Sequence, residues 1–221
     1  MKKIIAVIMC LVFVVSLSAC KTNAPTTEGE RVSVSAEKAE EMFEDMTEFA
    51  QQGKYDKAVE YYNSGAADAA DTDVRNWYYY SLAMQEHEEH GCVGYPLTLL
   101  QYNADEDFEP AKKAIGELQL IARDLNGAYD CDGVYVYILD GKIATSVGVR
   151  LTGMVFSSYE VVVKDETFFF AERETDGTHT LLYSIDYSNG QLTLNPTEDN
   201  TDDLFSGSYK PFSAEYPEII Y

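Results

Sequence analysis

The chain of 221 residues contains few of the side chains that enzymes use for proton transfer. It has 3 histidines, the residue type that most often serves as a general base near neutral pH. The sequence shows no glycine-rich phosphate loop, nucleophile elbow or ordered serine, histidine and aspartate set. We therefore expect a protein that is not an enzyme and that needs no cofactor.

Basic residues are also scarce. Lysine and arginine together number 16 against 38 aspartates and glutamates, which gives a formal net charge of -22. Binding to phosphate groups depends largely on lysine and arginine. We therefore expect neither nucleic acid nor anionic lipid head groups as partners. The hydrophobic fraction of 46% and the aromatic fraction of 13% are ample for a packed core, which excludes a disordered chain.

The sequence lacks an apolar run long enough to span a bilayer. Its longest run, residues 4–19, falls short of the roughly 20 residues that a membrane-spanning helix needs. Lys2 and Lys3 precede this run and Ser18 and Ala19 close it, which is typical of a secretory signal. The run Leu17-Ser18-Ala19-Cys20 resembles the lipobox of bacterial lipoproteins. That resemblance implies cleavage before Cys20, a lipid on its sulfur, and attachment to the outward face of a membrane.

The chain has 4 cysteines, and the lipobox accounts for two of them. Cys10 would leave with the signal and Cys20 would receive the lipid, so Cys92 and Cys131 would remain. Two interpretations are open, namely a disulfide formed outside the cell or two free thiols in an anaerobic source. A disulfide would connect residues 87–105, within the helical region, to the first turn of the following β region.

The sequence predicts an α+β protein in four parts. A signal peptide at residues 1–19 is followed by a flexible, polar tether at 20–34. Hydrophobic periodicity then predicts a helical domain at 35–126 and an antiparallel β domain at 127–221. Ser35 is a candidate N-cap, and Gly53 ends the first helix. A second helix, which ends near Gly65, follows so closely that the two must form an antiparallel hairpin. The apolar positions of the first helix are Ala39, Met42, Phe43, Met46, Phe49 and Ala50.

Residues 52–62 resemble the helix-turn-helix junction of a tetratricopeptide repeat, with Gly53 at the turn, Tyr55 in the hairpin and Ala58 at the close approach of the helices. One repeat further on, Trp77 begins the pattern of the next first helix. Residues 107–111 repeat the junction pattern and predict its partner helix, so residues 87–105 are interpreted as an insertion. The resemblance implies a concave peptide-binding groove. However, Asp45 and Gly65 depart from the pattern, and a plain bundle of helical hairpins fits equally well.

From Gly127 the apolar period changes to two, which is typical of strands. Asp140-Gly141, Asp176-Gly177 and Asn189-Gly190 predict hairpin turns. The result is a meander of up to eight strands that can close into a small barrel. This layout, which opens on Gly127 and Tyr129 and closes on residues 205–210, resembles the lipocalin-like domains of some bacterial lipoproteins. At roughly ninety residues the barrel is expected to be filled or open rather than hollow. The expected strands are 127–129, 134–139, 143–151, 159–163, 167–174, 180–187, 191–194 and 206–210.

Three groups of residues have side chains suited to chemistry, and none is predicted to be a site. His87, His90 and Cys92 could share a zinc ion, but no fourth ligand is evident and a polar helix end is the favoured interpretation. Glu172 and Glu174 share a strand face, as a pair of hydrolytic carboxylates would. The acidic segment 198–203 indicates only loose cation binding. No catalytic residue and no metal ligand are therefore predicted.

The sequence thus favours a lipid-anchored, outward-facing protein of the cell envelope that binds another envelope protein or a small-molecule ligand. An envelope hydrolase acting on glycans or peptides is the alternative. A factor that helps assemble another envelope machine is a third hypothesis.

Overall fold

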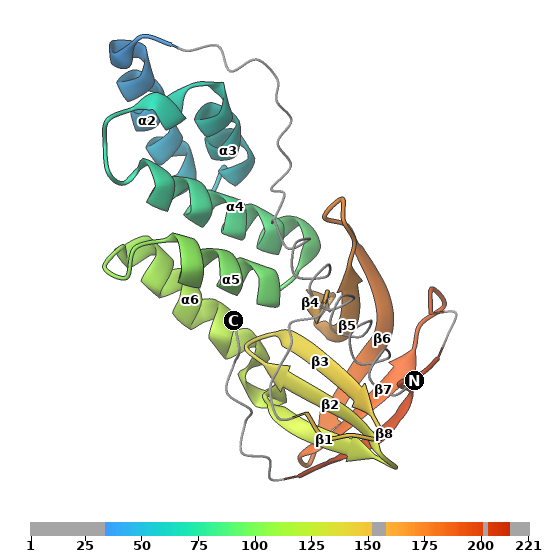
Figure 1. The fold of residues 1–221 in the computed structure, drawn as a ribbon. Helices are drawn as coiled ribbons and strands as arrows, with labels where there is room; N and C mark the ends of the chain where they lie inside the picture. Colours follow the sequence, from blue (N-terminus) through green and yellow to red (C-terminus); the bar gives the residue numbers. More distant parts are fainter. Residues whose placement is uncertain (1–33, 152–157, 201–202, 213–221) are drawn as a thin grey trace, which may run out of the picture. The chain divides into compact units, whose positions relative to one another are not determined.

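The computed structural model describes residues 34–151, 158–200 and 203–212. These residues form helices followed by a closed antiparallel barrel, which confirms the predicted α+β class (Figure 1). Cys20, the predicted signal and nearly all of the predicted tether lie outside the described residues. No helix within the described residues is long and apolar enough to span a membrane. The α-helices are α2 (Ala36–Gln51), α3 (Tyr55–Ser64), α4 (Val74–His90), α5 (Gly94–Asn103) and α6 (Glu109–Ala122).

Helices α2 and α3 form the predicted hairpin. The side chain of Ser35 accepts a hydrogen bond of 3.3 Å from the backbone N–H of Lys38, so Ser35 caps α2 as expected. Gly53 lies between the helices with a φ of 73°, a conformation that favours glycine. Met46 and Ala58 are fully buried where the hairpin packs.

The segment interpreted as an insertion is part of the helical bundle, and this corrects the sequence interpretation. Residues 87–105 include the end of α4 and the whole of α5, and α5 packs against α4 and α6 (Figure 1). Helix α5 buries residues around most of its circumference, so it has no polar stripe that would make its helical period visible in the sequence. Its buried residues are Gly94, Pro96, Leu97, Leu99 and Leu100. The second helix of the second hairpin is therefore α5, and α6 is a further helix beyond it.

The eight strands follow one another around the barrel in sequence order, and β8 pairs with β1 to close it (Figure 1). This confirms the predicted meander, and the predicted turns at Asp140-Gly141, Asp176-Gly177 and Asn189-Gly190 each lie between consecutive strands. The strands are β1 (Gly127–Cys131), β2 (Val134–Leu139), β3 (Lys142–Val147), β4 (Tyr159–Lys164), β5 (Thr167–Arg173), β6 (His179–Ser188), β7 (Gln191–Pro196) and β8 (Gly207–Pro211).

The interior of the barrel is filled by side chains from every strand. One hydrophobic cluster combines large residues that are at most 4% exposed, so the alternation of the strands places the apolar face inward, as expected for a small barrel. The hydroxyls of Tyr129 and Tyr209 donate to the backbone oxygens of Leu125 and Phe205 at 2.8 and 2.7 Å. The cluster contains Tyr129, Val136, Ile138, Ile143, Val161, Phe170, Tyr183, Ile185, Leu192, Leu194 and Tyr209.

Within the described residues, strands β3 and β4 pair at one position, Lys142 with Glu160. The segment between α4 and α5 pairs with β4. The N–H of Val93 donates to the oxygen of Val161 at 3.1 Å, and the N–H of Val163 donates to the oxygen of Gly91 at 2.9 Å. Residues 91–93 therefore act as a short extra strand, and they hydrogen-bond the helical region to the barrel.

Candidate functional site

The helical region contains a pocket of about 570 Å³, which we call the helical pocket. It lies between α2, the start of α3, α4 and α6, so alternate helices of the bundle form its sides. Its lining residues are Ala50, Gln51, Tyr55, Trp77, Tyr80, Glu109, Pro110, Lys113, Ala114 and Glu117.

Three half-buried aromatic rings form one wall of the helical pocket. Tyr80 meets Tyr55 and Trp77 edge to face, with ring centroids 5.8 Å apart in both pairs. Trp77 also packs against Phe108, whose ring centroid lies 5.1 Å away. Burial, followed by hydrogen bonding to Tyr80, raises the pKa of the Tyr55 hydroxyl above its ordinary value. The wall is therefore a preformed, uncharged surface.

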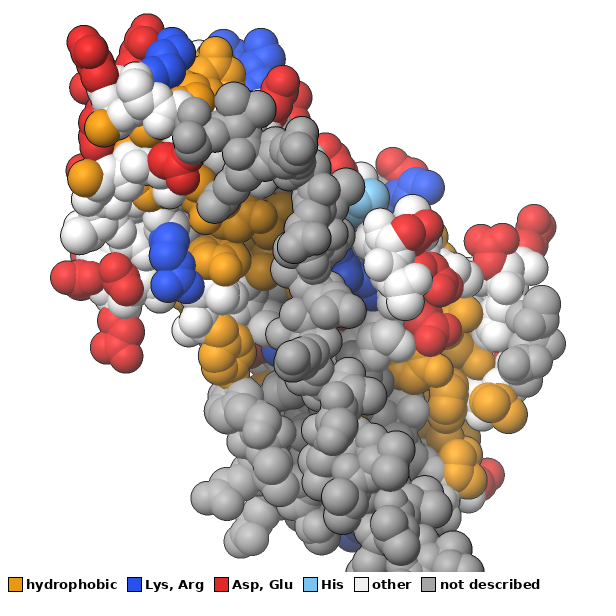
Figure 2. Space-filling view, turned by 45° about the horizontal axis from the view of Figure 1, so that its top comes forward, with side chains coloured by type: hydrophobic (Ala, Val, Ile, Leu, Met, Phe, Trp, Pro, Cys, Tyr) orange, Lys and Arg blue, Asp and Glu red, His pale blue; other side chains and the backbone are white. Residues whose placement is uncertain are grey.

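Charged side chains of α6 border one side of the helical pocket. Lys113 and Glu117 lie 3.7 Å apart on α6 and are 79% and 62% exposed, and Glu109 is also exposed. Figure 2 shows acidic side chains spread over the face in view, with hydrophobic side chains between them. The helical pocket thus combines an apolar wall with a solvated charged rim, as protein-binding surfaces do.

A second pocket, of about 710 Å³, lies where the helical region meets the barrel, and we call it the junction pocket. His87 and His90 at the end of α4 and His179 at the start of β6 all line it. These are the 3 histidines of the chain. The close approach of residues 91–93 to β4 explains why residues so distant in sequence meet here.

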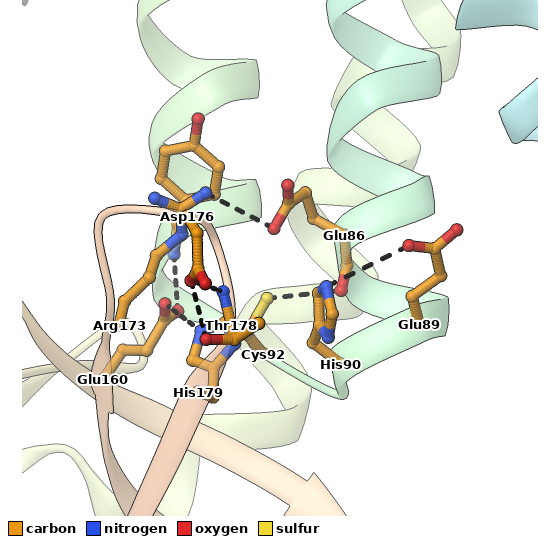
Figure 3. A network of polar contacts seen from close by, with 10 residues as sticks. Glu86, Glu89, His90, Cys92, Glu160, Arg173, Asp176, Thr178 and His179 are labelled. Carbon is orange, nitrogen blue, oxygen red and sulfur yellow. Dashed lines mark hydrogen bonds and ion pairs between the residues drawn. The ribbon is translucent and has the colours of Figure 1, made fainter. Parts of the chain in front are cut away.

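Cys92, Glu160 and His179 form a buried cluster beside the junction pocket, and Figure 3 shows their side chains converging. One candidate ligand atom from each of the three lies within 4.8 Å of the others. Nε2 of His179 lies 2.9 Å from Oε1 of Glu160. Oε2 of the same carboxylate accepts a hydrogen bond of 2.8 Å from the backbone N–H of Tyr95 in the first turn of α5. A carboxylate in this position is stabilised by the positive, N-terminal end of the α5 dipole.

An ion pair and a stacked guanidinium border the cluster. Nη2 of Arg173 lies 3.6 Å from Oε2 of Glu86, and the guanidinium stands over the ring of Tyr95 at 3.8 Å from its centroid. The thiol of Cys92 donates to the backbone oxygen of Glu86 at 3.3 Å. Burial, followed by the negative charges of Glu160 and Glu86, raises the pKa of this thiol well above its ordinary value. Without an added cation Cys92 is therefore a neutral thiol and a poor nucleophile.

The structure does not bring the side chains of His87, His90 and Cys92 together as a zinc site. Cys92 does lie close to a histidine, but that histidine is His179, from β6. Nδ1 of His87 instead contacts the backbone oxygen of Cys92 at 2.8 Å. The ring of His90 lies 5.4 Å from that of His179, measured between centroids.

The cysteines considered as a disulfide, Cys92 and Cys131, are both free thiols in the structure. They pack in different clusters. Cys92 lies with Val162 on the outer side of the barrel wall, and Cys131 packs against the interior cluster. The structure therefore does not join them. The physical reason is that Cys92 sits beside β4, whereas Cys131 ends β1 on the face that turns inward.

Glu172 on β5 and Glu174, the residue directly after β5, each accept a hydrogen bond from a neighbouring hydroxyl. Ser158 donates to Glu172 at 3.1 Å, and Thr180 donates to Glu174 at 3.1 Å. Neither carboxylate lines the helical pocket or the junction pocket. The acidic segment 198–203 lies partly outside the described residues.

Sequence reasoning missed Glu160 and His179. Glu160 lies on a strand whose other residues are mainly apolar, and its outward orientation alternates with the inward orientation of Val161. A glutamate in a predominantly apolar strand is the one signal that could have indicated a buried carboxylate.

None of the protein-family models, curated proteins or solved structures compared with this chain matches it. The site is therefore interpreted from its own geometry.

Proposed function

We propose that this chain is a lipid-anchored protein of the bacterial cell envelope that binds an extended segment of a partner protein in the helical pocket. The observation that supports this proposal most directly is the aromatic wall of Tyr55, Trp77 and Tyr80 in a pocket bounded by alternate helices. The lipobox-like run that ends at Cys20 supports the location.

The size and composition of the helical pocket suit the side chains of a peptide. Its volume of about 570 Å³ lies within the roughly 300–1,000 Å³ of typical ligand sites. Tryptophan and tyrosine are enriched among the residues that contribute most binding energy at interfaces. An apolar side chain of the partner would pack against Trp77 and Tyr80, while the exposed Lys113 and Glu117 remain available for polar contacts at the edge.

The charge of the chain indicates the chemistry of the flanking residues of the partner. Two of the three charged residues at the rim, Glu109 and Glu117, are acidic, and the chain as a whole has a net charge of -22. Opposite charge accelerates encounter and discriminates against acidic partners. The preferred segment therefore carries an apolar anchor flanked by lysine or arginine.

The barrel has a different part in this proposal. Its interior is filled by Phe170, Tyr183, Tyr209 and their neighbours. A small ligand would have to displace well-packed side chains to enter, which costs several kcal/mol for a large side chain. We therefore assign partner binding to the helices and treat the barrel as the rigid body to which they are attached.

Site-specific cross-linking in living cells tests the proposal. A photoreactive residue at position 113, on the rim, should capture a discrete partner, whereas one at Lys38, exposed on α2 outside the pocket lining, should not. A peptide from the captured region should bind the purified chain, and Tyr55→Ala should weaken that binding by at least about tenfold. Equal capture from both positions, or an unchanged affinity for a Tyr55→Ala variant that remains folded, would contradict the proposal.

A further inference from the structure

We infer that Cys92, Glu160 and His179 form a binding site for a divalent transition-metal ion of the zinc class. The three residues offer a sulfur, a carboxylate oxygen and an imidazole nitrogen, which are the three ligand types that zinc accepts in proteins. They come from the segment after α4, from β4 and from β6, so only the folded chain brings them together (Figure 3).

The ring nitrogen of His179 that can share an ion with Glu160 is Nε2. It lies 2.9 Å from Oε1 of Glu160, and because a carboxylate only accepts, Nε2 donates a proton to it when no ion is bound. An ion would take the place of this proton between the two atoms, with the proton of the neutral imidazole moving to Nδ1. Among the described residues Nδ1 has no hydrogen-bond partner, and the side chain is only 4% exposed. No contact at Nδ1 therefore holds the ring in the tautomer that would keep Nε2 from the ion.

The spacing of the three ligand atoms fits a small ion after modest movement. The atoms lie within 4.8 Å of one another, whereas a tetrahedral zinc ion with bonds of about 2.0–2.3 Å holds its ligands roughly 3.3–3.8 Å apart. A closing movement of about 1 Å is sufficient. Glu160 can take part without losing its contact to α5, because a carboxylate has about four lone-pair positions and the N–H of Tyr95 uses one.

The junction pocket provides access to the site and its fourth position. His90, whose ring lies 5.4 Å from that of His179, and His87 line this pocket together with His179. Three protein ligands with a fourth position open to a pocket are the arrangement of zinc ions that bind a water molecule or an exchangeable ligand. In this site the open position would face His90.

Binding exchanges one proton for one metal ion. The S–H bond of Cys92 breaks, a sulfur–metal bond forms, and the proton passes to the solvent, with no change in oxidation state. The ion replaces the proton on a thiol that is otherwise held neutral by burial, so each bound ion should release about one proton.

Metal titration of the full chain in detergent tests the inference. After treatment with a chelator, the chain should take up one equivalent of Zn²⁺ in competition with a chromophoric chelator. One equivalent of Co²⁺ should produce a thiolate-to-cobalt charge-transfer absorption. Cys92→Ser should abolish this absorption and weaken Zn²⁺ binding by at least about 100-fold, because even the neighbours of metal ligands account for 10–100-fold. The matched control, Cys131→Ser, removes the other thiol of the described residues and should leave both measurements unchanged.

The inference is overturned if wild-type chain shows no thiolate-to-cobalt absorption, or if Cys92→Ser binds Zn²⁺ within threefold of wild type. Circular dichroism establishes whether the variants are folded. If Cys92→Ser does not fold, His179→Gln takes its place, with the same two measurements and the same criteria.

Discussion

Glu160 contacts His179 and caps helix α5 at the same time. Its Oε1 lies 2.9 Å from Nε2 of His179 on β6, and its Oε2 accepts a hydrogen bond of 2.8 Å from the N–H of Tyr95 on α5. The carboxylate is buried, and Glu160 pairs with Lys142 where β3 meets β4. One side chain therefore links the barrel wall, the helical region and the cluster at the junction.

This double contact predicts a large effect of a small substitution. Glu160→Gln removes the charge that α5 and His179 contact, so we expect the free energy of unfolding to fall by about 1–3 kcal/mol, as for other buried hydrogen bonds to charged groups. Urea unfolding with a chelator present measures the change. Glu174→Gln, at an exposed carboxylate that also accepts one hydrogen bond, is the matched control and should stay within about 0.5 kcal/mol. Equal effects of the two substitutions would contradict the role of Glu160.

Gly91 allows the helical region to pair with β4. Its φ is 69°, and a Cβ atom there would lie 2.1 Å from the backbone oxygen of Val163. We expect Gly91→Ala to destabilise the chain by more than about 1 kcal/mol, since alanine is strained at positive φ and the contact is with backbone. Gly116→Ala, at an open position on α6, should instead stabilise it by up to about 1 kcal/mol. Thermal unfolding of both variants measures the contrast, and a stable Gly91→Ala would show that the pairing is dispensable.

The buried hydroxyl of Tyr209 should make the free energy of unfolding depend on pH in the alkaline range. Burial raises the pKa of this phenol above its ordinary value of 10.0, and its hydroxyl donates to Phe205 inside the barrel. The folded chain therefore keeps a proton that the unfolded chain loses above pH 10, so stability is fully present below that pH and falls as the pH rises further. Tyr209→Phe should lower stability near pH 7 by about 0.5–1.5 kcal/mol and reduce the alkaline slope. Urea midpoints between pH 7 and pH 11 would show an unaltered slope if this assignment is wrong.

The two cysteines of the described residues should differ in reactivity. Cys92 is fully buried and Cys131 is partly exposed, so metal-free native chain should alkylate at Cys131 at least about tenfold faster. In denaturant without reductant both should react, as free thiols do. Mass spectrometry of the peptides measures both rates. Protection of both cysteines in denaturant would instead show that they are bonded.

Cys20 determines attachment to the membrane in the proposed function. Cys20→Ala should leave the precursor uncleaved and without an acyl group, whereas the wild-type chain should begin at Cys20 and partition into detergent. Two acyl chains hold a protein firmly because each buried methylene contributes about 0.8 kcal/mol. Intact-mass measurement of the chain from membranes tests this, and a wild-type chain that begins elsewhere without an acyl mass would overturn it.

The sequence by itself determined the fold class and nearly every strand, because these features follow from local periodicity and turn chemistry. The alternation of apolar residues and turns such as Asn189-Gly190 indicated a meander in the correct order. Helix α5 was not predicted, because a helix that is buried around most of its circumference has no polar stripe to show its period.

Tertiary structure alone decided which residues meet. The pairing of residues 91–93 with β4 brings Cys92 to Glu160 and His179, across sequence separations that no local pattern encodes. It also decided that alternate helices enclose the helical pocket and that Cys92 and Cys131 lie on opposite faces of the barrel wall. Local periodicity indicates which face of its own helix or strand a residue occupies. Only the packing of whole elements against one another determines what that face contacts.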